Sequence, residues 1–286
     1  MRGLVERWDR FLVRETSTRS AALLRLIFPL LWWARLGNEL LPVRDLDPAR
    51  LVLSLNFFAS TSLMLIGWKS RWTTAWVGLT VLVATYGFAG DPDVQNWGAH
   101  HVTFLAHCTM LLALTPCGRS FSLDRWLLLR ECRARSVAPP PERGPTWGLG
   151  LIALQTSTVY AFGAWDKTSW PFLSGQRLEH IFRSLYWGAD PIEIPGIGLF
   201  FVCVAVGVVV VEYGLAVTLF LPRFQRASIA VGLVLHALIY LLLPVRIFTL
   251  ATWATYLAYL DPDRVDEALR PLLDASDHRL DGASGP

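Results

Sequence analysis

Residues 196–221 read GIGLFFVCVAVGVVVVEYGLAVTLFL and hold one charged side chain, Glu212, in 26 positions. At 1.5 Å per residue, a helix of this length crosses the ~30 Å hydrocarbon core of a bilayer, and it is longer than most helices in soluble cores. The stretch therefore predicts a transmembrane helix. Its carboxylate lies about 16 residues from the first end, which is near mid-depth.

Similar apolar blocks recur along the chain and are separated by short polar segments. The predicted spans are 20–41, 51–68, 72–89, 97–116, 146–166, 196–221, 227–243 and 246–260. Only 17% of the 286 residues are charged, against about 25% in soluble domains. We predict an all-α fold, a polytopic integral membrane helical bundle of about eight transmembrane helices at 1–262, followed by a short polar cytoplasmic tail at 263–286. Residues 176–187 alternate basic and apolar groups and predict a helix on the membrane surface.

Lysine and arginine residues indicate the orientation, because they gather in cytoplasmic loops. With the N-terminus inside, 18 of them fall on the cytoplasmic side and 6 on the outer side, and the loop at 118–145 holds six of the 18. Both termini are therefore expected in the cytoplasm, in a multi-pass protein of the cell inner membrane whose surroundings are the lipid bilayer. The net charge of +3 is spread along the chain, which argues against nucleic-acid binding. The four cysteines form no CxxC pair, so no metal site is predicted.

Several ionisable side chains fall inside these spans or at their ends, where each one costs a few kcal/mol unless it has a partner or a function. They are Arg25, His100, His101, His107, Asp166, Lys167, Glu212 and His236. His100, His101 and Lys167 all lie near the outer surface in this topology. Glu212 and His236 both lie near mid-depth on consecutive antiparallel helices, so we expect them to pair.

Helical spacing gives the fifth predicted span two polar faces. Tyr160 and Lys167 are seven residues apart and share one face, whereas Gln155 and Asp166 are eleven apart and share another. A neutral lysine amine in an apolar site is a usable general base, and a histidine can relay the proton. Lys167 and His100 are therefore candidate catalytic residues for proton abstraction from a lipid-soluble phenol or quinol.

The other polar and aromatic candidates have supporting roles. Candidates for substrate or cofactor binding are His101, Tyr160, Gln155, Trp97 and Trp170, and candidates for a structural polar core are Arg25, His107, Glu212 and His236. A purely structural interpretation stays open throughout. Lys167 could extend its ammonium to the membrane surface, the histidines and Glu212 could be interhelical hydrogen-bond partners, and Arg25 could fix the first helix by binding backbone carbonyls or a carboxylate.

Four segments, in order along the chain, resemble those of a known family. They are AALLRLIFPLLW (21–32), WGAHHVTFLAHCTMLLALTPCGRSFSLDRW (97–126), LQTSTVYAFGAWDKTSWPFLSG (154–175) and VVEYGLAVTLFLPRFQRASIAVGLVLH (210–236). The set resembles the HTTM family, the transmembrane domain related to vitamin K-dependent gamma-carboxylase, including its small bacterial branch of the sporulation-delaying protein B type.

The resemblance implies roles for matching positions. In the carboxylases, a lysine in the third segment deprotonates reduced vitamin K, and it corresponds to Lys167. A histidine in the second segment is also implicated, and it corresponds best to His100. The implied cofactor is a reduced naphthoquinone (vitamin K-like). The implied chemistry is lyase-like: the deprotonated quinol reacts with oxygen, the resulting strong base abstracts a glutamate γ-proton, and CO2 adds to the carbanion.

The sequence also departs from the carboxylases. Asp166 stands where they carry the first of two adjacent lysines, the pair Gly163-Ala164 is reversed, and no segment corresponds to their large luminal domain. The small bacterial branch, in which a short protein acts with a partner in maturing a secreted toxin peptide, fits this length better. Three hypotheses follow: a quinol-dependent or peptide-directed enzyme, a non-enzymatic membrane maturation or export factor for a secreted peptide acting with a partner protein, and a structural membrane subunit.

Overall fold

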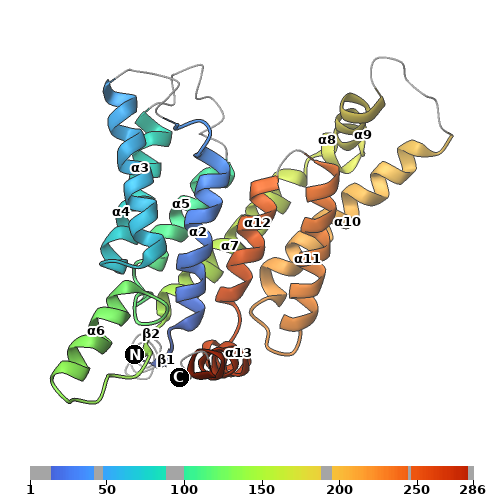
Figure 1. Ribbon diagram of the computed structural model, residues 1–286. Coiled ribbons are helices and arrows are strands. Elements are labelled where there is room, and N and C mark those ends of the chain that lie inside the picture. Colours follow the sequence, from blue (N-terminus) through green and yellow to red (C-terminus); the bar gives the residue numbers. More distant parts are fainter. Residues whose placement is uncertain (1–13, 42–47, 88–99, 188–194, 244–245, 283–286) are drawn as a thin grey trace, which may run out of the picture. The chain divides into compact units, whose positions relative to one another are not determined.

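The computed structural model describes residues 14–41, 48–87, 100–187, 195–243 and 246–282, without the side chains of His100, Trp187 and residues 274–282. Helices account for most of this part of the chain (Figure 1), so the all-α prediction is confirmed. The contacts divide the chain into two compact units. Unit 1 comprises Met1–Ala153 and His236–Pro286, and unit 2 comprises Leu154–Leu235.

Each predicted span corresponds to a helix. The helices are α2 (Arg19–Leu36), α3 (Pro48–Ile66), α4 (Ser70–Gly87), α5 (His100–Leu112), α7 (Trp147–Lys167), α10 (Ile197–Thr218), α11 (Gln225–Leu242) and α12 (Arg246–Thr255). Among the described residues, three helices are long and apolar enough to cross a membrane: α3, α10 and α11. With 10 residues, α12 rises only about 15 Å, which is half the hydrocarbon thickness.

Unit 1 is organised around α2, which packs against α3, α5 and α12. Two indoles on α2 fix its neighbours: Trp32 Nε1 donates to Thr109 Oγ1 on α5 at 3.2 Å, and Trp33 Nε1 donates to Thr61 Oγ1 on α3 at 2.7 Å. Helices α4 and α5 approach closely at Gly78, because a Cβ there would lie 2.4 Å from Met110 Cγ. Small residues at helix contacts are typical of packing inside membranes.

A second layer of contacts ties the polar segments of unit 1 together. Strands β1 (Glu15–Ser17) and β2 (Arg143–Pro145) pair antiparallel, with Thr16 opposite Gly144. The polar connection at 118–145 contains α6 (Leu123–Ala134), and the C-terminal segment forms α13 (Pro262–Gly282), which contacts α2 and β1. The antiparallel pair of strands is the only β-sheet among the described residues, and the sequence does not predict it.

Unit 2 is built from the second half of α7, the short helices α8 (Trp170–Leu173) and α9 (Gln176–Phe182), α10 and most of α11. The expected helix at 176–187 is α9 followed by a π-helical turn, Arg183–Trp187. Helices α8 and α9 both contact α10. The turn between them contains Gly175 at φ +77°, and a Cβ there would lie 2.7 Å from the backbone of Phe201 and Val202. A glycine is therefore required where this turn meets α10.

Candidate functional site

The charged centre of unit 2 is an ion pair between Lys167, the last residue of α7, and Glu212 on α10. Lys167 Nζ lies 2.9 Å from both carboxylate oxygens and donates a third hydrogen bond to the Gly163 carbonyl at 3.2 Å. Three acceptors match the three hydrogens of an ammonium group. The Glu212 side chain is 9% exposed and that of Lys167 is 29% exposed, so the carboxylate is nearly buried and the ammonium is partly exposed.

The direction of the lysine side chain bears on its role. Its bond to Gly163 points back along α7, one turn from the helix end, because side chains on a helix tilt toward the N-terminus. An ammonium that extends to the membrane surface would point the other way, past the helix end. A Cβ at position 163 would lie 3.4 Å from Nζ, which is an ordinary van der Waals contact, so this path does not depend on the glycine.

The sequence of α10 places Glu212 within a buried stripe. Phe201, Ala205, Val209, Glu212 and Leu215 recur at spacings of four, four, three and three residues, which is one helix face. Ala205 and Val209 pack with Phe172 of α8 in a small apolar cluster. The stripe that binds α8 thus continues into the carboxylate, which is how an almost wholly apolar helix presents one acid to the end of α7.

Two hydroxyl groups lie next to the pair in sequence. Thr168 and Tyr213 directly follow Lys167 and Glu212, and their hydroxyl groups lie 3.3 Å apart. Trp165 and Trp170 are largely exposed, and Trp165, two positions before Lys167, lies on another side of α7. Tyr160 is buried and Gln155 is partly buried on the same helix as Lys167. The hydroxyl groups of Thr168 and Tyr213 therefore lie close to the lysine–glutamate pair, where they could hydrogen-bond a phenolic ligand.

We did not expect Lys167 and Glu212 to be partners. From the sequence we assigned Glu212 to His236 and placed Lys167 nearer the outer surface. The missed signal is the backward tilt of helical side chains, which moves the ammonium about one turn deeper. Glu212 and His236 lie in different compact units, and the contact between them stays a prediction. Asp166 is exposed, so it and Lys167 lie in different surroundings despite being adjacent.

The other predicted site residues are distributed over unit 1. His101 Nε2 accepts a hydrogen bond from Arg35 Nε at 3.2 Å, and Arg35 also pairs with Glu39 at 2.7 Å. His236 is buried, with its ring 5.4 Å from that of Phe248. His107 is partly buried on α5. Trp97 and the side chain of His100 lie outside the described residues, so their proposed proximity to Lys167 stays a prediction.

Arg25 has the most complete set of partners. It is fully buried, and its guanidinium donates to the carbonyls of Cys117, Met64, Leu65 and Phe121. Met64 and Leu65 belong to the last turn of α3, whose carbonyls have no partner within the helix. Arg25 therefore completes the hydrogen bonding of a helix end and joins it to the turn before α6.

The SLD turn at 122–124 caps two helices. Ser122 Oγ accepts from Arg125 N at 2.9 Å at the start of α6. Asp124 accepts from Lys69 N, Ser70 N and Ser70 Oγ, each at 2.7 Å, at the start of α4. Both are the hydrogen bonds that free backbone N–H groups at helix starts require. These residues hold the fold together and contribute no free acid or base.

Residues 39–264 of the chain, well over half of it, match the HTTM domain. The chain belongs to the HTTM domain family. The match includes both Lys167 and Glu212, whereas the Arg25 segment precedes it. Together with the three long apolar helices among its described residues, membership of the family makes this HTTM protein an integral membrane protein, related to vitamin K-dependent carboxylase. No match is found among curated proteins or solved structures.

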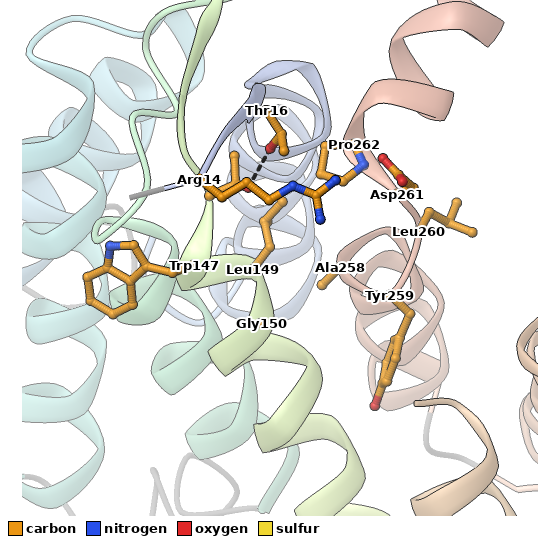
Figure 2. Close-up of a pocket in the computed structure, with 11 residues that line it drawn as sticks. Arg14, Thr16, Trp147, Leu149, Gly150, Ala258, Tyr259, Leu260, Asp261 and Pro262 are labelled. Atoms are coloured by element: carbon orange, nitrogen blue, oxygen red, sulfur yellow. Dashed lines mark hydrogen bonds between the residues drawn. The ribbon is translucent and has the colours of Figure 1, made fainter. Parts of the chain in front are cut away.

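One cavity of unit 1 is shown in Figure 2. It measures about 250 Å³ and lies between β1, the start of α7 and the connection from α12 to α13. The side chain of Arg14 extends across it toward Pro262, and Thr16 and Thr146 share a hydrogen bond of 2.6 Å at its edge. None of the predicted site residues of this HTTM protein lines this cavity.

Proposed function

We propose that this HTTM protein uses Lys167 and Glu212 together to take a proton from a lipid-soluble quinol or from a peptide substrate, in a carboxylase-like lyase reaction. The observation that carries the proposal is the ion pair itself. A fixed cation in a membrane protein needs only backbone acceptors, as Arg25 has, whereas this cation is bound to a group that can itself accept a proton.

Lys167 and Glu212 have different roles in this proton transfer. As an ammonium–carboxylate pair, Lys167 and Glu212 can accept one proton in total. Lys167 passes a proton to Glu212 along their 2.9 Å contact, and its amine then takes the substrate proton. The pair ends as an ammonium and a carboxylic acid. The ammonium remains beside the substrate and stabilises its new negative charge.

A reduced naphthoquinone fits the residues around this pair. The exposed ring of Trp170, three residues after Lys167, offers an apolar face for a bicyclic ring, and the hydroxyl groups of Thr168 and Tyr213 offer hydrogen bonds. When bound, the quinol supplies an acidic O–H and the reducing power for the reaction with oxygen. Lys167 and Glu212 would supply the base, and Trp170 would orient the ring. The assisting role of His100 is the one that the family resemblance implies.

The test uses the two lysines of the chain, Lys69 and Lys167. Purified protein in nanodiscs is supplied with a reduced naphthoquinone, and its oxygen-dependent consumption is followed. Lys167→Arg and Glu212→Gln should each abolish the activity, because guanidinium stays protonated and an amide accepts no proton. Lys69→Arg, at an exposed loop position, is the matched control and should retain it.

The competing interpretation makes a different prediction for the same variants. A maturation or export factor that binds a secreted peptide with a partner protein needs only the charge at position 167. In that case Lys167→Arg remains functional in a peptide-maturation assay, and no quinol is consumed by the wild type. That combination would contradict the enzymatic proposal.

We further propose that all eight predicted spans cross the inner membrane, the eighth as the short α12 together with the 3-10 turn at Tyr256–Ala258 that follows it, with both termini and the loop at 118–145 in the cytoplasm. The excess of lysine and arginine in the assigned inner loops supports this orientation. Single cysteines placed in α6 should resist labelling by a membrane-impermeant thiol reagent in intact cells and react after lysis. Labelling in intact cells would reverse the orientation.

A further inference from the structure

A cavity of about 290 Å³ in unit 1 lies where α4 and α6 begin, against the turn at 116–119. Three arginines line it, Arg71, Arg119 and Arg125, together with one acid, Asp124. Arg125 is paired with Glu142 at 3.3 Å, and the Asp124 oxygens are occupied by the start of α4. In the described part of the chain, no carboxylate pairs with Arg71 or Arg119, so the cavity carries a net positive charge.

The two unpaired guanidinium groups are held in place by backbone carbonyls. Arg71 Nε donates to the Ala113 carbonyl at 3.1 Å, and Arg119 Nη1 donates to the carbonyl of Arg143. These bonds fix one edge of each group and leave its other N–H donors for a ligand. Guanidinium donors of this kind suit the oxygens of a phosphate.

The surface next to the cavity is apolar and continuous along α4. Trp72, Trp76, Leu79, Val83 and Tyr86 recur at spacings of four and three residues and are between 44% and 79% exposed. Trp126 on α6 is also exposed, and two cations lie over indoles nearby, Lys69 over Trp68 and Arg130 over Trp126. Indoles beside basic groups are typical of the membrane–water interface. The cavity thus lies at the headgroup end of a helix face suited to acyl chains.

We propose that this cavity binds the phosphate of an anionic phospholipid, with Arg71 and Arg119 as its ligands and the acyl chains along the exposed face of α4. The net positive charge favours a headgroup such as glycerol phosphate over one that carries a choline cation. The site is separate from Lys167 and Glu212, which lie in unit 2.

Native mass spectrometry of the full chain in a neutral detergent tests the proposal by titration with phosphatidylglycerol, phosphatidylcholine and inorganic phosphate. The wild type should bind phosphatidylglycerol most tightly. Arg71→Gln with Arg119→Gln should weaken that binding roughly thirty-fold, since each arginine near the phosphate contributes about fivefold. Arg71→Lys with Arg119→Lys should retain most of it.

The control is Arg133→Gln with Arg135→Gln, which removes the same charge from exposed positions at the end of α6, outside the cavity. It should leave phosphatidylglycerol binding nearly unchanged. An equal loss in this control would overturn the proposal in favour of general charge attraction. Equal binding of phosphatidylcholine would overturn the headgroup selectivity, and competition by inorganic phosphate at matching concentrations would assign the site to free phosphate. The thermal unfolding of all three double variants is measured as well, so that a folding defect is not read as lost binding.

Discussion

Arg25 in α2 and Lys167 in α7 are both cations in helices of a membrane protein, but their hydrogens go to different kinds of acceptor. Arg25 is fully buried and donates only to four backbone carbonyls, among them those of Met64 and Leu65. Lys167 donates to both oxygens of the Glu212 carboxylate and to one carbonyl.

The acceptor decides what each cation can do. A backbone carbonyl cannot take up a proton at ordinary pH, and guanidinium does not release one, so the Arg25 site is chemically inert. A carboxylate and an amine can exchange a proton, so the Lys167 site can change its charge state. The first arrangement is a means of ending helix α3 inside the protein, and the second is suited to acid–base chemistry.

The largest expected effect belongs to Arg25. Arg25→Leu leaves several buried carbonyls without donors, and each unsatisfied buried group costs about 1–3 kcal/mol. We expect a total loss of about 3 kcal/mol or more, measured as thermal or denaturant unfolding in detergent. Arg133→Leu, at an exposed position of α6, should change little and is the matched control. If the Arg25→Leu variant has the same unfolding temperature as the wild type, the hydrogen bonds of the guanidinium to the end of α3 do not stabilise the fold.

Removing one member of the Lys167–Glu212 pair should cost less, about 1–3 kcal/mol, because the lysine is partly exposed. Lys167→Met should cost more than Glu212→Leu, since it strands the more deeply buried carboxylate, whereas an unpaired lysine can reach water. The double variant should recover most of the loss, because both charges are then absent. Unfolding of all three variants measures the coupling, and strictly additive losses would contradict a direct pair.

The sequence predicts the helices of this protein better than their contacts. The apolar block at 196–221 corresponds to α10 at Ile197–Thr218. Hydropathy predicts such a helix because it depends only on the side chains of one segment. The ladder that pairs Thr16 with Gly144 depends on hydrogen bonds between segments far apart in the chain. No local pattern in three-residue strands reveals such a partner.

The candidate site shows the same division. Lys167 and Glu212 stand out in the sequence because ionisable groups are rare in apolar helices. Their pairing could not be derived from depth alone, because the length and direction of the lysine side chain shift its ammonium by one turn. Sequence reasoning singles out His101 but not its donor Arg35, which lies in the first predicted span at 20–41. A single sequence identifies costly groups, and coordinates are needed to show which of them satisfy one another.

A smaller effect is expected at the cap of α4. Asp124→Ala removes the acceptor of three hydrogen bonds at the start of this helix. The loss of a helix cap costs about 1 kcal/mol, and a carboxylate at a helix start adds a favourable charge, so we expect about 1–2 kcal/mol. Ser122→Ala, which removes the single cap bond of α6, should cost less when both are measured by chemical denaturation. The reverse order would show that the SLD turn acts mainly through α6.

The smallest expected effect is a pH dependence from Asp263 at the start of α13. Burial alone would raise the pKa of this carboxyl group, but hydrogen bonds from the Arg143 side chain and the Ser17 backbone outweigh it and place the pKa below its ordinary value. A carboxylate whose pKa is lowered by folding stabilises the folded state fully above its unfolded pKa, about 3.9, and loses that contribution as the pH falls from there through the lower folded value. The effect should be slight, because the Arg143 and Asp263 side chains are 45% and 36% exposed and salt screens such a pair.

Denaturant unfolding of wild type and Asp263→Asn at pH 6 and at pH 3 should show a difference in stability at the higher pH that shrinks at the lower one. Arg143→Gln should flatten the same pH dependence, and an Asp263→Asn difference that stays constant with pH would mean that shape, and not charge, determines the contribution of this residue.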